Sequence, residues 1–377
     1  MLAVFFINKC IFKVLNFKKQ LLKKKIENNG MQTVRLTAFK KNVILKTTSP
    51  MNYKSSPFYL LLFYVSLSFA QTTIKDAQTN YPVSYATVSF NNGNGLFAND
   101  EGQFTFTKKL YPDIDSLYIS ALGFKDLKVA TANLPETLLM HTEVNALDEV
   151  FITAKIDRKF KVEDIKPYLD DEYHHCWLPT IESEIAVFFN NPDESLKKIT
   201  KVHFPITLES KDWDKRKRSN ADKKPFSTLF KVKFYNNENG LPGKEIILRT
   251  IVFRATEKDG DKFTLDVSDE DIFIPKSGVF VSLQVLGYTD DKGKLLSNKK
   301  YKEIKSNYGS IIKIPTNFRP LLPFTDKISG HKTYIKRVFV NENNWTLFER
   351  GNNFQSTLLQ SGLNNYGIGL TFNVYKD

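Results

Sequence analysis

Short segments that suit β-strands, separated by turn residues at close intervals, constrain this chain more than any other feature. Residues 86–90 alternate apolar and polar side chains, and the stretch NNGNG at 91–95 must turn because Gly and Asn tolerate positive φ. Residues 103–107 alternate again after a second turn at 99–102. Helical periodicity is absent between residue 71 and about residue 140, so this region predicts a small all-β sandwich of about 70 residues.

The alternation also predicts which side chains form the core of that sandwich. Ala86, Val88 and Phe90 share one face at period two, and Phe104 and Phe106 share another. Apolar faces of two packed sheets meet in the middle of a sandwich. We therefore expect Phe104 and Phe106 to point inward from one strand.

The remainder of the chain is again rich in β-strand patterns and predicts a larger antiparallel β-sandwich. One exception is the segment 162–173, VEDIKPYLDDEY, which predicts a short helix with Pro167 near its start. Apolar runs of four to six residues predict about eight strands. The predicted strands are 199–208, 229–235, 245–256, 262–267, 278–287, 310–314, 332–340 and 367–375.

Residues 51–71, MNYKSSPFYLLLFYVSLSFAQ, have the organisation of a secretory signal peptide that starts at an internal methionine. A polar region with Lys54 precedes an apolar run over 58–69, and Ser68 and Ala70 are the small residues that signal peptidase requires. The apolar run is too short for a stable membrane span. We expect cleavage after Ala70, which makes Gln71 the first residue of the exported form.

The positive charge of the chain is concentrated in residues 1–50, which hold eleven Lys and Arg residues against Glu27. Removing these and Lys54 leaves 42 basic and 40 acidic residues in 71–377, so a net charge of +13 falls to +2. The exported chain therefore gives no electrostatic indication of nucleic-acid binding. We interpret residues 1–50 as a mis-assigned upstream leader; an amphipathic targeting presequence is the alternative.

Four phrases of the first β region resemble the carboxypeptidase regulatory-like domain: residues 74–76 (IKD), 82–88 (PVSYATV), 97–104 (FANDEGQF) and 115–124 (DSLYISALGF). The resemblance implies a seven-stranded, transthyretin-like β-sandwich without catalysis of its own, of the kind found at the N-termini of exported and TonB-dependent outer-membrane proteins. Residues 147–154, LDEVFITA, resemble the hand-off segment that follows such domains. The region after it resembles, more loosely, the uncharacterised β-sandwich that follows the regulatory-like domain in other exported proteins.

The expected organisation has five parts. They are the leader 1–50, the signal peptide 51–70, the carboxypeptidase regulatory-like domain 71–142, a linker 143–160 and a β-sandwich domain 161–377. Cys176 is the one cysteine left after cleavage, which excludes an intrachain disulfide. Its expected role is that of a small buried hydrophobic side chain.

Zinc-dependent hydrolysis is the chemistry that the family name suggests, and it requires a recognisable set of metal ligands. Neither His-x-x-Glu nor HExxH occurs among the histidines after residue 70, which are His141, His174, His175, His203 and His331. The one local cluster of metal-ligand types is His174, His175 and Cys176, but neighbouring residues on a strand point to opposite faces. These three are weak metal candidates, and we expect no catalytic residue and no cofactor.

One basic cluster stands out in the exported chain, and we treat it as a set of candidate ligand contacts: Trp213, Lys215, Arg216, Lys217 and Arg218. Lysine and arginine would meet phosphate-bearing headgroups or an acidic polysaccharide, and a tryptophan ring can stack on a sugar. The alternative is a charged tip of a long loop between two strands.

These observations favour an exported, non-catalytic binding or assembly module of the periplasm, outer membrane or cell surface. The expected partner is an envelope protein or a polysaccharide, with association at the outer-membrane surface and no nucleic acid. Two alternatives stay open. One is a carbohydrate-binding surface protein for polysaccharide uptake, which an aromatic strip on one sandwich face would favour; the other is a metal-dependent hydrolase or peptidase with an unrecognised site.

Overall fold

A computed structural model shows that the fold is all-β, as predicted. The structure describes residues 71–143, 158–216, 222–247, 249–296, 301–305, 309, 311–328, 330–340, 344–352 and 354–376. All of these belong to one compact unit, 67–377. The expected leader, signal peptide and hand-off segment lie outside the described residues, as do Lys217 and Arg218.

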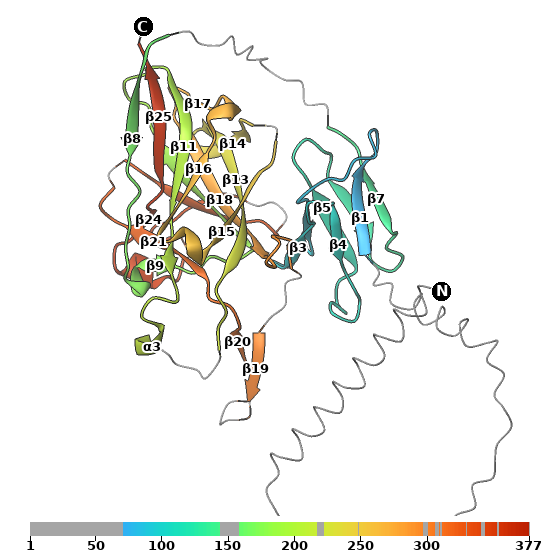
Figure 1. Ribbon diagram of the computed structural model, residues 1–377. Coiled ribbons are helices and arrows are strands. Elements are labelled where there is room, and N and C mark those ends of the chain that lie inside the picture. The colour runs from blue at the N-terminus through green and yellow to red at the C-terminus, as the bar shows by residue number, and fades with distance from the viewer. Residues whose placement is uncertain are drawn as a thin grey trace, which may run out of the picture. The chain divides into compact units, whose positions relative to one another are not determined.

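The first 73 residues described form a small sandwich of seven strands in two sheets (Figure 1). The three-stranded sheet has the order β4-β1-β7, and the four-stranded sheet has the order β3-β2-β5-β6. Strands β1 and β7 run parallel, whereas the other pairs are antiparallel. The strands are β1 (Gln71–Asp76), β2 (Thr87–Ser89), β3 (Gly95–Phe97), β4 (Gln103–Thr105), β5 (Ser116–Ser120), β6 (Leu127–Ala130) and β7 (Thr137–Met140).

The core of the small sandwich contains the side chains that period two predicted. Phe104 and Phe106 are each 4% exposed and pack in one cluster with Ala86, Val88 and Phe90. The NNGNG stretch is the hairpin turn between β2 and β3, closed by a hydrogen bond from the Phe90 amide to the Asn94 carbonyl oxygen. The predicted inward direction of both phenylalanines is therefore confirmed.

The larger sandwich has a seven-stranded sheet and a five-stranded sheet. The first has the order β14-β13-β18-β10-β22-β23, and β15 pairs with β13. Its strands are β10 (Ser183–Phe189), β13 (Ser227–Glu238), β14 (Leu241–Glu245), β15 (Ile251–Thr256), β18 (Val279–Tyr288), β22 (Thr333–Arg337) and β23 (Thr346–Leu347). The second has the order β16-β11-β25-β8, and β17 pairs with β11. Its strands are β8 (Phe160–Ile165), β11 (Lys197–Pro205), β16 (Lys262–Asp266), β17 (Phe273–Ile274) and β25 (Gly369–Tyr375). Every ladder in these two sheets is antiparallel, as predicted.

Smaller elements complete the larger sandwich. A four-stranded sheet joins β12 (Thr207–Leu208), β21 (Pro320–Thr325), β24 (Asn365–Tyr366) and β9 (Cys176–Trp177), and a hairpin joins β19 (Tyr301–Lys305) to β20 (Ile311–Pro315). The short helices are α3 (Trp213–Arg216), α4 (Thr357–Gln360) and the 3-10 turns η2 (Tyr173–His175), η3 (Glu257–Asp259) and η4 (Ser268–Glu270).

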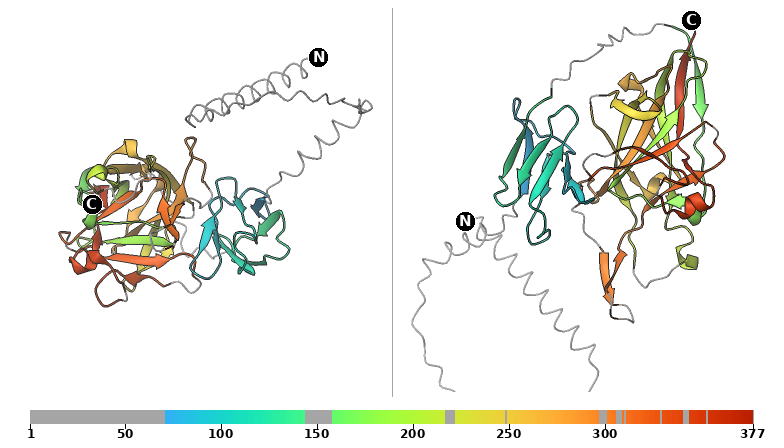
Figure 2. Two further views of the ribbon diagram at one scale, coloured as in Figure 1. Left: turned by 90° about the horizontal axis from the view of Figure 1, so that it is seen from below. Right: turned by 180° about the vertical axis from the view of Figure 1, so that it is seen from behind.

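The helix predicted over 162–173 is wrong. Its first residues belong to strand β8, which pairs with β25 from Ile165↔Leu370 to Phe160↔Tyr375. Figures 1 and 2 show these two strands, green and red, side by side near the C-terminus. Pairing with β25 gives the backbone of β8 the hydrogen bonds that a helix would have supplied, and Pro167 stops the strand from continuing.

A run of stacked phenylalanine rings joins the two main sheets. Phe253 on β15 stacks on Phe230 of β13 at 5.3 Å, on Phe204 of β11 at 5.2 Å and on Phe263 of β16 at 4.3 Å between ring centroids. Phe204 and Phe230 are fully buried. Phe204, Phe230 and Phe253 belong to the large hydrophobic core, Phe263 is partly buried against it, and the four rings hold the five-stranded sheet against the seven-stranded one.

The central strands of the seven-stranded sheet are buried on both faces. On the face away from the core, the Glu184 carboxylate accepts hydrogen bonds from Tyr235 Oη at 2.7 Å and from Ser282 Oγ at 2.6 Å. Part of this face contacts the small sandwich: Lys231 Nζ donates to the Tyr85 carbonyl oxygen at 2.9 Å, and Phe97 packs against Phe339. The five-stranded sheet differs, because outward side chains on several of its strands are exposed.

Replacing Phe104 tests the register of the small sandwich. Phe104→Ala removes a ring that is 4% exposed, and the cavity should lower the free energy of unfolding by about 3–5 kcal/mol. Urea unfolding followed by circular dichroism measures the change. Tyr81→Ala is the matched control, because that ring is 73% exposed and its loss should change stability by less than about 0.5 kcal/mol. Equal effects of the two substitutions would show that the register is misassigned.

Candidate functional site

A hollow of about 540 Å³ opens on the solvent-facing side of the five-stranded sheet. Its basic and acidic side chains are Lys166, Lys201, His203, Lys262 and Asp164. The other residues that line it are Pro167, Leu169, Thr264 and Thr371. They come from β8 and the turn after it, from β11, from β16 and from β25, so four strands contribute to one surface.

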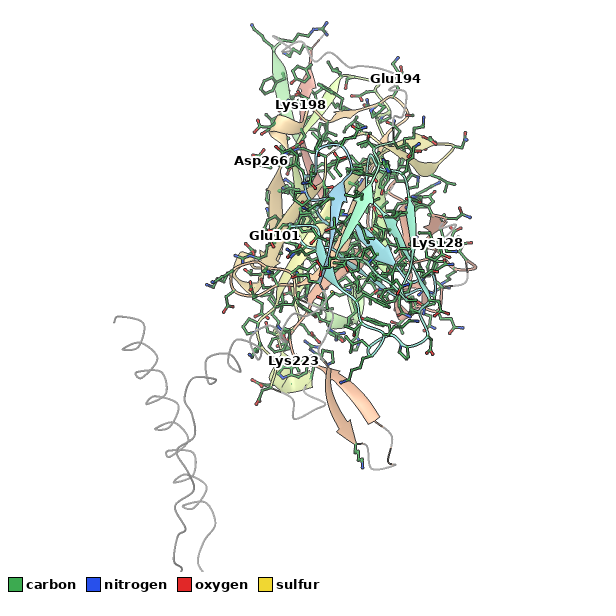
Figure 3. All side chains as sticks on the ribbon, turned by 90° about the vertical axis from the view of Figure 1, so that its right-hand side faces the viewer. Glu101, Lys128, Glu194, Lys198, Lys223 and Asp266 are labelled. Atoms are coloured by element: carbon green, nitrogen blue, oxygen red, sulfur yellow. The ribbon has the colours of Figure 1, made fainter. Side chains whose placement is uncertain are left out.

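Strand alternation explains why polar residues converge here. Val202 and Phe204 of β11 are fully buried in the core. Lys201 and His203 alternate with them along the strand, so their side chains point to the opposite face of the sheet. On the neighbouring strand β16, Phe263 packs against the core. Thr264 therefore points outward, and it lies directly opposite His203 in the register. Figure 3 labels Lys198 and Asp266, which belong to the outward sets of β11 and β16.

Gly369 makes room for the wall of the hollow. Gly369 lies on β25 and pairs with His203 on β11. A Cβ atom at position 369 would lie 2.5 Å from the Ile165 carbonyl oxygen and 2.5 Å from the Pro167 nitrogen. The turn that follows β8 can therefore approach the sheet only because position 369 has no side chain. This close approach brings the end of β8 toward His203.

A chain of hydrogen bonds fixes the His203 ring. Thr371 Oγ1 donates to Asp164 Oδ1 at 2.8 Å, so the oxygen of Thr371 must accept from His203 Nε2, which lies 2.7 Å away. The proton of neutral His203 then sits on Nε2, and Nδ1 accepts from Thr264 Oγ1 at 3.0 Å. Both ring nitrogens are thus satisfied by threonine hydroxyls.

The electrostatic surroundings favour the neutral form of His203. Burial lowers the pKa of the imidazole, as do the nearby charges of Lys262 and Lys201, while Asp164 acts in the opposite direction. In the part of the chain that the structure describes, Lys166, Lys201 and Lys262 have no ion-pair partner within 4 Å. The hollow therefore combines one carboxylate with three lysines that form no close ion pair among the described residues.

The three weak metal candidates do not converge on one point. His174 is exposed, with its ring 5.7 Å from that of Tyr173, and His175 Nδ1 lies 2.9 Å from Asp170 Oδ2. Cys176 Sγ donates to the Glu172 carbonyl oxygen. Their local structure is a 3-10 turn leading into β9 and not the strand on which their opposite directions were predicted.

The described residues contain no group of three or more His, Cys, Asp or Glu side chains arranged to hold a metal ion. Burial raises the pKa of the Cys176 thiol to about 12, so it stays protonated at neutral pH. Burial also lowers the pKa of His331 to about 4, which keeps that ring neutral. Neither side chain is set up as a nucleophile or a charged ligand contact.

Among the described residues of the basic cluster that the sequence singled out, Trp213 and Arg216 are engaged in contacts within the protein. Trp213 packs edge-on against Phe318, with Lys223 Nζ 3.9 Å from its ring centroid. Arg216 donates to two backbone carbonyl oxygens and lies over the ring of Tyr173. Lys215 stays exposed beside Asp212. The contact hypothesis for this cluster remains a prediction.

Beneath this cluster lies a buried ion network that sequence analysis missed. The Glu209 side chain is 2% exposed and accepts from Lys223 Nζ at 2.9 Å and from Arg319 Nη2 at 3.0 Å. Burial alone would raise the pKa of Glu209, but the hydrogen bonds and charges of Arg319 and Lys223 lower it below its ordinary value. The network anchors the loop that holds Trp213.

The residues of the hollow were also missed as a group. The sequence indicates His203 only as one of the histidines tested for a zinc site, and no motif in it singles out Lys201, Lys262, Asp164, Thr264 or Thr371. A local signal existed, because Lys201 and His203 alternate with Val202 and Phe204 on one strand. Their partners on β8, β16 and β25 are distant in sequence, and no local pattern pairs them.

Removing the charge of Glu209 tests the ion network. Glu209→Gln keeps the shape but leaves Lys223 and Arg319 without their carboxylate, so the free energy of unfolding at neutral pH should fall by about 3 kcal/mol. Because the pKa of Glu209 is lowered in the folded state, its contribution is present above the unfolded pKa of about 4.3 and disappears as the pH falls through the folded value.

Chemical unfolding of both proteins as a function of pH measures this difference. Glu194→Gln is the matched control, since Glu194 forms an ion pair with Lys276 that is 60% and 75% exposed and is worth at most about 1 kcal/mol. Figure 3 labels Glu194 and Lys223 at opposite ends of the view. A loss for Glu209→Gln no larger than that of the control would contradict the network's structural role.

Comparisons with known proteins assign no family to this chain. No family model matches it, and no curated protein matches it. None of the helices in the described part of the chain has the length and apolar character of a membrane span. The chemistry of the hollow is therefore inferred from its own side chains.

Proposed function

We propose that this chain is an exported, non-catalytic binding or assembly module of the cell envelope. The signal-peptide pattern at 51–70 supports export. The expected compartment is the periplasm, the outer membrane or the cell surface, and the expected partner is an envelope protein or a polysaccharide. No cofactor and no nucleic acid enter this proposal.

The hollow on the five-stranded sheet carries the binding part of the proposal. Hydrogen bonds hold the His203 ring in place, with Nε2 on Thr371 and Nδ1 on Thr264, and Thr371 in turn donates to Asp164. A polar surface of this kind beside three lysines suits recognition of a charged ligand.

We further propose that residues 71–142 are a carboxypeptidase regulatory-like domain. The four sequence phrases support this assignment, and so do the seven strands in sheets of three and four. Gly102 and Gly123, which lie in two of these phrases, have φ of +68° and +81°, values that glycine adopts without strain. The domain would then act as a connecting or presenting module, with ligand contacts on the larger sandwich.

Carbohydrate binding for polysaccharide uptake is the second candidate, and one observation favours it. Phe160 is 51% exposed, and its ring lies 5.7 Å from that of Tyr375 on the neighbouring strand. Phe160 and Asp164 belong to the same outward set of β8, so the aromatic pair and the hollow share one face. In contrast, Tyr235, Phe280 and Tyr334 on the seven-stranded sheet are buried against each other and are not a stacking platform.

The export proposal predicts a defined N-terminus. Cleavage after Ala70 should give an exported form that begins at Gln71. N-terminal sequencing and intact mass of the envelope fraction measure it, and Ala70→Arg should block processing because signal peptidase requires a small residue there. A chain in that fraction that still carries residues 1–50, or recovery of all the protein from the cytosol, would refute the export proposal.

A further inference from the structure

We propose that the hollow on the five-stranded sheet binds an oxyanion of the ligand, meaning a carboxylate, sulfate or phosphate group. This inference rests on the binding role proposed above and specifies the chemistry of the group that is bound. Lys166, Lys201 and Lys262 supply three ammonium groups around one opening, and they come from three different segments of the chain. Their convergence is a product of the fold.

The carboxylates near the hollow only partly offset this charge. Asp164 accepts a hydrogen bond from Thr371 and is the only acid that lines the opening within the described residues. Asp266 lies opposite Lys201 in the register, and the two charges attract each other, although Asp266 Oδ1 accepts from the amide and hydroxyl of Ser268 and the two described side chains form no ion pair within 4 Å. Three lysines against these two carboxylates leave an excess of one positive charge.

Thr264 gives the site a donor that depends on the state of His203. With Nδ1 unprotonated, the Thr264 hydroxyl proton points at the imidazole. When Nδ1 gains a proton, it becomes a donor to Thr264 Oγ1, and the hydroxyl proton must turn away from the ring. Thr264 is exposed and lines the hollow, so its proton then becomes available to a bound oxyanion.

The groups that face His203 determine the direction of the pH effect. They are Asp164 on β8, Lys201 on its own strand and Lys262 on β16. The pKa of His203 is lowered from 6.5 mainly by burial, so the ring is neutral at neutral pH and becomes a cation on acidification. Oxyanion binding should therefore strengthen as the pH falls, and a bound oxyanion should in turn raise the pKa of His203.

Binding of the purified chain to three polyanions tests the proposal. The probes are polygalacturonate, dextran sulfate and polyphosphate, with neutral dextran as the uncharged control, and isothermal titration calorimetry reads the affinity. The probe that binds most tightly identifies the carboxylate, sulfate or phosphate source. Lys201→Ala/Lys262→Ala should weaken that binding by about tenfold, because it removes two of the three lysines.

The matched control is Lys109→Ala/Lys125→Ala, which removes the same charge from exposed positions of the small sandwich. It should weaken binding less than about twofold. Equal losses in the two double variants would overturn the site, since long-range charge alone would then explain binding. Failure of all three polyanions to bind would also overturn it, without affecting the export proposal, which depends on where the chain is found and where it begins.

A second variant isolates the role of His203. As the pH falls below 6.5 and through the lowered pKa of His203, the affinity of the wild type for dextran sulfate should rise by about threefold or more, because the imidazole gains a proton there and the sulfate groups do not titrate. His203→Gln should bind with a pH-independent affinity, and circular dichroism verifies its fold. The same rise with pH in the Gln variant would refute the proposed coupling between His203 and Thr264.

Discussion

The stack of four phenylalanines is the interaction on which the larger sandwich and its candidate site both depend. Phe204 and Phe263 face each other across β11 and β16 and pack inward on Phe253. Side chains alternate along a strand, so fixing these two rings inward fixes His203 and Thr264 outward, where they also face each other. A slip of one residue would turn the histidine into the hydrophobic core and turn the rings to the opposite face of the sheet.

The two main sheets differ in how far their outer faces are buried. The seven-stranded sheet has buried side chains on both faces of β10, β13 and β18, and the charge of Glu184 is held there by neighbouring hydroxyl groups and lysines. Burial would raise the pKa of Glu184, but Lys233 and Lys336, with hydrogen bonds from Ser282 and Tyr235, lower it. The five-stranded sheet has exposed side chains on its second face, and the proposed binding hollow lies there.

Local patterns predicted much of the fold. The inward direction of Phe104 and Phe106 follows from period two, and the expected strand at 229–235 lies within β13. The central strand β10 was missed although its sequence includes the run IAVFF, and β21 was missed because Pro320 and Pro323 resemble strand breakers. The prolines are tolerated because β21 pairs only in short stretches with three different strands.

The candidate site could not be predicted in the same way, because it depends on registers between distant strands. Thr371 and His203 are 168 residues apart, and Asp164 and Thr371 are 207 apart, so no spacing rule links them. The helix expected at 162–173 also hid Asp164, which became a site residue only because β8 pairs with β25. Sequence patterns indicated which side chains point outward, whereas the sheet order determined which of them meet.

Chemical-shift mapping tests most directly the claim that the open face of the five-stranded sheet binds ligand. Amide and histidine resonances of the labelled chain would be followed while the tightest of the polyanions is added. The account predicts that the shifts concentrate on β8, β11, β16 and β25 around His203, with its imidazole nitrogen signals among the largest. Shifts that concentrate instead on the loop around Trp213, or that spread evenly over the lysines of both sandwiches, would contradict it.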